Sequence, residues 1–198
     1  DYDVTFSLGD YGTLTSGSLS QRINAGAGAT APEFVTDDYW VFTGWDKTFS
    51  EISGDLSITA QYEADDDNDN IANSTDTDRD GDGLFNDAEI ASGTDPDDSD
   101  SDDDGLLDGV ETGGGIFSDS TDTGTNPLVA DTDGDGLLDG AEVTAGTNPT
   151  LEDTDNDGLI DKVETGSGTF VDKSDTGTNP LVADSDGDGL LDGVEAGL

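Results

Sequence analysis

A twelve-residue acidic pattern recurs five times along the chain and constrains its fold more than any other feature. In each copy, Asp stands at positions 1, 3 and 5, Gly at position 6 and Glu at position 12. The copies start at Asp78, Asp100, Asp131, Asp153 and Asp184. A single short acidic run is usually a solvated loop, but five copies in one register are not accidental. We therefore expect the larger part of the chain to be organised around these loops.

The spacing of the loops reveals a longer repeat. Successive loops start 22, 31, 22 and 31 residues apart, so the full repeat is 53 residues long and holds two loops. After one loop of each pair Gly-Thr-Asp/Asn-Pro comes directly, whereas after the other it comes behind an insert, at 113–122 and 166–175. Self-similarity at a fixed period predicts an array in which each unit packs against its neighbours.

The residue types and their spacing predict calcium sites. Side-chain oxygens at positions 1, 3, 5, 9 and 12 and the carbonyl of position 7 match the ligand spacing of the EF-hand loop, in which Gly at position 6 permits a sharp turn. Mg²⁺ demands a stricter octahedron and keeps its waters, so Ca²⁺ is the leading metal, with at least five ions. The chain has no His, Cys or Met, so the common zinc, copper and haem sites are not expected.

The predicted ligands repeat loop by loop, and position 7 contributes its carbonyl oxygen. They are Asp78, Asp80, Asp82, Leu84, Asn86, Glu89, Asp100, Asp102, Asp104, Leu106, Asp108, Glu111, Asp131, Asp133, Asp135, Leu137, Asp139, Glu142, Asp153, Asp155, Asp157, Leu159, Asp161, Glu164, Asp184, Asp186, Asp188, Leu190, Asp192 and Glu195. Apolar residues at positions 8 and 11 are expected to form a thin seam between units.

Residues 64–77 have two interpretations, an acidic linker or a degenerate sixth loop. In the loop frame, positions 1, 3, 5, 9 and 12 are Asp65, Asp67, Asp69, Asn73 and Asp76. Asn stands at position 6 instead of Gly, and Asn also tolerates positive φ. Both interpretations stay open at this point. Acids outside the loops and in the two inserts could bind further ions or could simply be solvated.

The charge of the chain limits its partners. The net charge is −44, and 39 of the 49 acids lie after residue 63 with only three bases. A segment so acidic and so poor in large apolar residues cannot offset its chain entropy by burial, so bound cations are expected to order it. Nucleic acid and anionic membrane surfaces attract clustered Lys and Arg and are not expected partners. No apolar run reaches the ~18 residues of a membrane span, so no membrane insertion is expected.

Residues 1–63 predict a small, mostly-β domain. Val4, Phe6 and Leu8 alternate with polar residues, and 57–62 repeats the alternation, which is the period of half-buried strands. Both Trp and all four Tyr lie in this part of the chain. Tyr39, Trp40 and Trp45 could in principle form a sugar-binding platform, but core packing is the favoured interpretation.

The first part of the chain carries one family resemblance. Tyr2–Phe6, Pro32, Phe42–Trp45 and Thr59–Tyr62 resemble the Listeria–Bacteroides repeat, also called the internalin B-type repeat, although the stretch before Pro32 departs from it. That resemblance covers about 1–63 and implies a β-grasp-like module of bacterial surface proteins.

The Asp-rich loops, together with the Gly-Thr-Asn/Asp-Pro motifs after them, resemble the bacterial thrombospondin type 3 repeat over about 65–198. That family implies an irregular, calcium-organised repeat array, in which ions replace a hydrophobic core. The residues that leave each loop favour only about two helical turns before Gly and Pro end them, so the paired helices of an EF-hand are not expected. The predicted domains are thus 1–63, 64–77 and 78–198.

These features favour a non-catalytic, calcium-rigidified stalk or spacer in a bacterial surface or secreted protein, joined to neighbouring domains of a longer chain. The alternative is a calcium-dependent recognition or adhesion module that binds a protein or glycan, as a dockerin or an adhesin does. Catalysis is not expected, because the loop pattern already accounts for every prominent acid. The sequence has no starting Met and ends just after a loop, as expected of a fragment from an extracellular or cell-surface protein.

Overall fold

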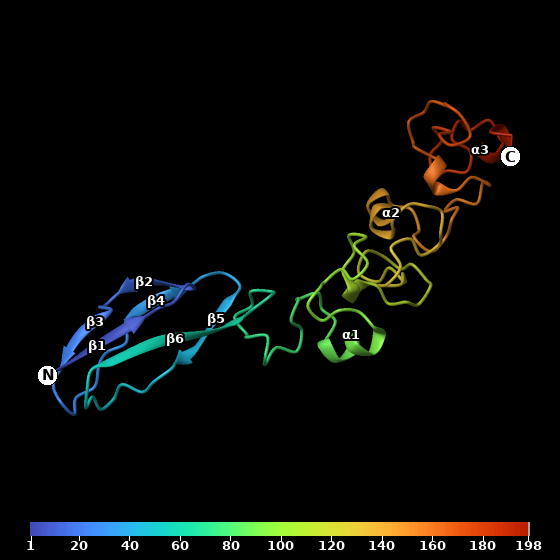
Figure 1. Cartoon of the computed structure of the whole chain (residues 1–198). Coiled ribbons are helices and arrows are strands. Elements are labelled where there is room, and N and C mark those ends of the chain that lie inside the picture. Colours follow the sequence, from blue (N-terminus) through green and yellow to red (C-terminus); the bar gives the residue numbers. More distant parts are fainter. Residues whose placement is uncertain (198) are drawn as a thin grey trace. The chain divides into compact units, whose positions relative to one another are not determined.

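The computed structural model describes residues 1–197, which divide into two compact units (Figure 1). The first is Asp1–Gly81 and the second begins at Asp82. The division falls inside the loop of residues 78–89, so the second half of that loop belongs to the second unit. The structure is mostly strands in the first unit and short helices joined by irregular loops in the second.

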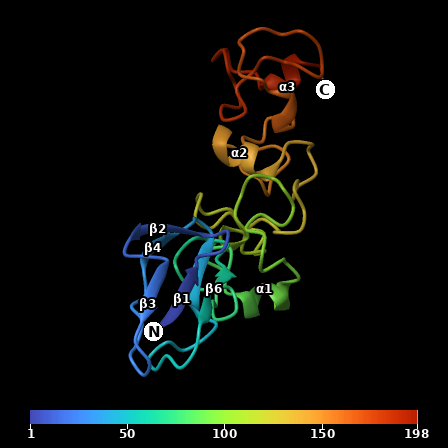
Figure 2. The ribbon, with the colours of Figure 1, turned by 60° about the vertical axis from the view of Figure 1, so that its left-hand side comes forward.

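The first unit contains two open sheets. The four-stranded sheet has the order β3-β1-β6-β5, in which β1 and β6 are parallel and the other pairs are antiparallel. In Figure 2, β1 lies between β3 and β6. A second sheet pairs β2 with β4. The strands are β1 (Tyr2–Ser7), β2 (Gly12–Ser16), β3 (Ser20–Ile23), β4 (Glu33–Thr36), β5 (Trp40–Trp45) and β6 (Leu56–Ala64). The strands expected from the two alternating stretches are therefore present.

An apolar core holds the first unit together. Val4 and Phe6 from β1 and Ile58 from β6 are buried together with Ile52. Trp45 packs edge-on against Phe6, with ring centroids 5.1 Å apart, so this tryptophan is a core residue. Neighbouring aromatic rings prefer such edge-to-face geometry because of their quadrupoles.

The other two residues of the candidate sugar platform differ from Trp45. Trp40 stacks on Tyr11 with centroids 3.6 Å apart, which occupies one face of its ring. Tyr39 is exposed and has a φ of 65°, as expected of a turn residue rather than a strand residue. The three side chains therefore do not form one continuous aromatic surface.

The second unit is an array of loops, each closed by a short helix. In Figures 1 and 2, α1, α2 and α3 succeed one another along the unit in chain order. The helices are α1 (Asn86–Ser92), η1 (Asp108–Val110), α2 (Asp139–Ala145), η2 (Asp161–Val163) and α3 (Asp192–Glu195), where η marks a 3₁₀ helix. The prediction of short helical turns is confirmed. Within residues 82–197, strand pairing is limited to the isolated bridges Asp119–Asp122 and Asp172–Asp175.

The two helix types alternate because successive loops are continued by different sequences. Gly93 and Gly146 end α1 and α2 with φ of 96° and 89°, and each donates its N–H to the carbonyl of the position-12 glutamate. This left-handed glycine cap completes two helical turns. Where an insert continues the loop, Glu111 and Glu164 leave the helical conformation, so only the 3₁₀ turns η1 and η2 form.

The expected apolar seam at positions 8 and 11 is wrong. Position 8 precedes each helix in extended conformation, and this geometry turns its side chain outward in most loops. The exposed position-8 side chains are Phe85, Leu107, Leu138 and Leu191. Buried aliphatic packing comes instead from position 7, at Leu106 and Leu159.

No helix within residues 1–197 has the length and apolar character needed to cross a bilayer.

Candidate metal centres

The first aspartate of each loop closes the loop on itself. Asp100 accepts hydrogen bonds from the N–H groups of Asp104, at 3.1 Å, and Gly105, at 2.9 Å. Asp153 accepts the equivalent bond from Gly158, at 2.9 Å. Gly105 and Gly158 have φ of 97° and 101°, a conformation that glycine adopts without steric cost. The glycine at position 6 thus lets the backbone fold around the first carboxylate.

This folding gathers the carboxylates of positions 1, 3 and 5. Within each such group, one oxygen from every residue lies within 4.8 Å of the others. The groups include Asp65, Asp67 and Asp69; Asp100, Asp102 and Asp104; and Asp131, Asp133 and Asp135. Position 5 is held by the N–H of position 7, as in the 2.6 Å bond from Leu106 to Asp104. The structure therefore brings together side chains that the loop pattern predicts as ligands.

Several of these carboxylates have buried oxygens without a hydrogen-bond partner. They belong to positions 3 and 12 of three loops: Asp102, Glu111, Asp133, Glu142, Asp155 and Glu164. Buried polar atoms in folded proteins are almost always partnered, so such a set demands an explanation. Oxygen ligands in groups of three or more carboxylates are the donor set that a hard divalent cation requires. The residues present therefore fit calcium.

Burial without a counter-charge also shifts the acidities of these groups. Burial, reinforced by the neighbouring aspartates, raises the pKa of Asp102, Asp133 and Asp155 to about 6. Burial raises the pKa of Glu111, Glu142 and Glu164 to about 8, again reinforced by nearby carboxylates. A bound divalent cation reverses this effect because it favours the ionised form.

Position 9 has a role that the sequence pattern does not reveal. Both oxygens of Asp139 accept bonds from Thr132 at position 2, from the N–H at 2.8 Å and from the hydroxyl at 2.6 Å. Ser101 and Asp108 make the same pair of bonds at 2.9 and 2.6 Å. The position-9 carboxylate therefore braces the start of its own loop, which explains the recurrence of Ser and Thr at position 2.

Consecutive loops are joined by one recurring hydrogen bond. The N–H of position 10 in each loop donates to the position-5 carboxylate of the preceding loop. The four bonds are Gly109 to Asp82 at 2.7 Å, Gly140 to Asp104 at 3.2 Å, Lys162 to Asp135 at 2.9 Å, and Gly193 to Asp157 at 3.2 Å. The junction is the same whether the step between loops is short or long, so the inserts loop out without altering it.

Close backbone approach explains most residues at position 10. A Cβ on Gly140 would lie 2.5 Å from the carbonyl oxygen of Asp104, and one on Gly193 would meet Asp157 in the same way. The fourth loop instead carries Lys162, whose Nζ donates to the carbonyl of Gly136 in the preceding loop. The glycines at position 10 were the available sequence signal for this junction, and the loop pattern alone did not identify them.

Threonines of the Gly-Thr-Asn/Asp-Pro motif support the position-12 glutamates. The buried hydroxyl of Thr125 donates to Glu111 Oε1 at 2.9 Å, and Thr123 and Thr125 bond to each other at 2.6 Å. Thr147 lies 3.5 Å from Glu142 Oε1 in the equivalent place. Sequence reasoning used this motif as a mark of the repeat and as a helix stop, and it missed the role of the threonine.

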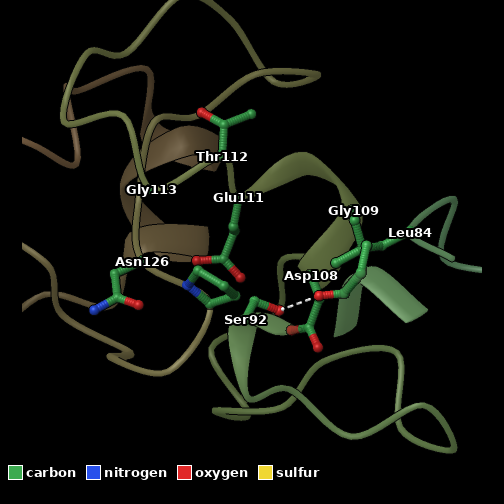
Figure 3. A pocket seen from close by; sticks show the side chains of 10 residues that line it. Leu84, Ser92, Asp108, Gly109, Glu111, Thr112, Gly113 and Asn126 are labelled. Carbon is green, nitrogen blue, oxygen red and sulfur yellow. Dashed lines mark hydrogen bonds between the residues drawn. The ribbon is translucent and has the colours of Figure 1, made fainter. Parts of the chain in front are cut away.

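A cavity of about 510 Å³ lies between α1 and the second loop. Leu84, Ala88 and Ser92 line one side, and η1 with Glu111 lines the other. Figure 3 shows the carboxylate of Glu111 turned into this cavity, away from Thr112. The position-12 glutamate therefore faces a partly open pocket between two successive loops.

Residues 65–76 adopt the hydrogen bonding of the other loops. Asp65 accepts bonds from the N–H groups of Asp69 and Asn70, both at 3.1 Å, as position 1 does elsewhere. Asn70 has a φ of 75° in the place of the usual glycine. Asp66 and Asn73 repeat the bond between positions 2 and 9, at 3.0 Å. This geometry favours a degenerate loop over a plain linker.

The acids of the inserts make local hydrogen bonds. Asp119 accepts bonds from the N–H and hydroxyl of Thr121, at 2.8 and 2.6 Å, and these bonds lower its pKa. Asp122 accepts a 2.8 Å bond from Thr112, and Thr165 and Asp175 repeat it at 2.7 Å. These hydrogen bonds fix the ends of both inserts.

Four stretches of the chain match the family model of the bacterial TSP3 repeat. They are residues 78–99, 131–151, 153–169 and 184–196. TSP3 repeats are calcium-binding structural repeats, and the acidic groups described above fit that character. The second loop, 100–111, lies outside the matched stretches although its geometry is that of its neighbours. Neither a curated protein nor a solved structure matches the chain.

Proposed function

We propose that the TSP3-like array is a non-catalytic structural module whose fold depends on calcium. The proposal rests on one observation, which is the composition of the interior of the array. From Asp82 to residue 197, the buried side chains include twelve Asp and Glu residues, whereas the buried Val, Leu, Ile or aromatic side chains are Leu106 and Leu159. Such an interior is stable only when cations neutralise the carboxylates, because isolated buried charges are very costly.

In the folded loops, the chain's own residues orient the ligands. In the second loop, position 1 is fixed by the N–H groups of positions 5 and 6, and position 5 by the N–H of position 7. The threonine of the Gly-Thr motif positions the glutamate of position 12. Calcium supplies the positive charge that holds these carboxylates together, and at least five ions are expected from the five strong loops.

The array would act as a stalk or spacer in a bacterial surface or secreted protein. Extracellular calcium-binding modules bind with dissociation constants of roughly 10⁻⁴–10⁻³ M, so such sites fill outside the cell and empty inside it. Folding would then occur after export. For the first unit we propose the β-grasp-like module of the Listeria–Bacteroides type, which its strands and aromatic core support.

Calcium titration of the whole chain tests the proposal. Hydrodynamic radius and far-ultraviolet circular dichroism are measured with calcium in excess and then with EGTA. We expect contraction and protease resistance in calcium, and expansion of residues after 82 in EGTA. Both tryptophans lie in the first unit, so their fluorescence should stay unchanged and serves as an internal control. Identical radius and dichroism in the two conditions would refute the proposal.

A second candidate function is calcium-dependent recognition of a protein or glycan. The inserts expose apolar side chains, with Ile116 at 76%, Phe170 at 58% and Val171 at 63% exposure. Pull-down experiments in calcium and in EGTA, with Phe170→Ser as the variant and Thr169→Ser as its control, test this candidate. Binding that requires both calcium and Phe170 would support recognition as the function.

A further inference from the structure

Three buried carboxylates from two different loops converge at the junction of the second and third loops. Asp104 and Glu111 belong to the loop 100–111, whereas Asp139 belongs to the loop 131–142. One oxygen of each lies within 4.8 Å of the others. Their exposures are 6%, 5% and 0%, so the group is inside the unit rather than on its surface.

The hydrogen bonds to these three carboxylates bring no positive charge to the group. Asp104 accepts from Leu106 N at 2.6 Å and from Gly140 N at 3.2 Å, and Asp139 accepts from Thr132. Glu111 Oε1 accepts from Thr125, but its Oε2 is buried without a partner. All of these donors are neutral. An unpartnered, buried carboxylate oxygen beside two other carboxylates is the environment that a divalent cation satisfies.

We propose that Asp139 is a ligand of the cation held by the preceding loop, so that each cation site is completed by the next loop along the chain. The inference rests on the proposed calcium function, and it adds which other loop supplies a ligand to each cation site. It moves the position-9 aspartate from the site of its own loop, where the twelve-residue pattern places it, to that of the loop before.

The backbone hydrogen bond that joins Gly140 to Asp104 has counterparts at the other junctions. The position-5 carboxylates of four loops each accept a bond from the next loop, with the sequence separations 27, 36, 27 and 36. In all four bonds the acceptor lies in one loop and the donor in the loop that follows it, so each loop is supported by its successor in the chain.

The fourth and fifth loops differ in the burial of two of these positions. Asp157 and Glu164, at positions 5 and 12 of the fourth loop, are buried. Their counterparts Asp188 and Glu195 are exposed. Within the described residues, burial of positions 5 and 12 therefore accompanies the packing of the next loop, as at the junction of the fourth and fifth loops.

Nuclear magnetic resonance of the whole chain tests the shared site. The amides of Gly105 and Gly136, at position 6 of the second and third loops, report the occupancy of each loop during a CaCl₂ titration. In D139N we expect the midpoint at Gly105 to rise at least about 10-fold, as for loss of a ligand-shell carboxylate, and that at Gly136 to change less. Asn keeps the acceptor for Thr132 N, and D119N, in an insert, is the matched control.

The outcomes distinguish the shared site from calcium binding itself. A larger midpoint shift at Gly136 than at Gly105, or equal shifts at both, would overturn the shared site while leaving calcium binding intact. No response of either amide to CaCl₂ in the unsubstituted chain would overturn the calcium function as well. D192N provides an independent second variant. It should raise the midpoint at Gly158 more than that at Gly189, and the reverse order would overturn the proposal.

Discussion

The two units of this chain have interiors of opposite chemical character, one apolar and the other acidic. The first buries Val4, Phe6, Ile52 and Ile58 beneath aromatic rings, as small β domains commonly do. The second buries carboxylates and has almost no apolar core. Apolar burial does not require bound ions, whereas the proposed function makes the order of the second unit depend on calcium. The comparison therefore predicts that removal of calcium affects the second unit and not the first.

The largest effect is expected from removing core volume in the first unit. Ile58→Ala should lower its free energy of unfolding by about 2–5 kcal/mol, the usual loss for a fully buried aliphatic side chain. Urea unfolding monitored by tryptophan fluorescence measures it. The loss should be equal in calcium and in EGTA. A loss present only in calcium would contradict the independence of the two interiors.

The corresponding change in the second unit removes a buried charge. Glu142→Gln should weaken calcium binding by the loop 131–142 at least about 10-fold, because it deletes the closing carboxylate. Isothermal titration calorimetry measures the change, and Glu152→Gln, at an exposed glutamate, is the control. Unfolding of the first unit should be unaffected. An unchanged calcium titration would show that Glu142 is not a ligand.

A smaller effect is expected at a junction between loops. Gly140→Ala should destabilise the calcium-bound array by about 1–3 kcal/mol, because the new Cβ meets the carbonyl of Asp104. Within the helix α2 alone, replacing Gly by Ala should stabilise the protein by about 1 kcal/mol. A net loss of stability would therefore arise at the junction between the loops and not in the helix. Gly114→Ala is the control, because its new Cβ would meet only the hydroxyl oxygen of Thr112, at an ordinary contact distance of 3.5 Å. Proteolysis between the second and third loops is the measurement.

The smallest effect is expected at Lys162 of the fourth loop, whose ammonium group donates a hydrogen bond to the carbonyl of Gly136 in the third loop. Lys162→Gly restores the residue type of the other junctions and removes a cation near the loop 131–142. Calcium affinity of that loop should rise by roughly two- to fivefold, the range of exposed charge interactions, and less at high salt. Lys173→Gly is the control. A fall in affinity would show that Lys162 stabilises the bound form instead.

The loops were predictable from sequence because their determinants lie within twelve residues. Asp100 meets the N–H groups of Asp104 and Gly105, which are close along the chain, so spacing alone fixes that contact. Strand alternation at Val4 and Phe6 is local in the same sense. The strand order β3-β1-β6-β5 was not predictable, because β1 pairs with a strand about fifty residues away.

The sequence by itself therefore determined where the carboxylates are placed, where the backbone turns and where each short helix ends. Only the tertiary structure decided which carboxylates of different loops lie together. Position 9 looks local in the pattern, yet Asp139 lies with Asp104 and Glu111 of the loop before it. The physical reason is that a carboxylate has two oxygens with several lone pairs. Asp139 braces Thr132 in its own loop and still faces its neighbour, and no spacing rule reveals the second contact.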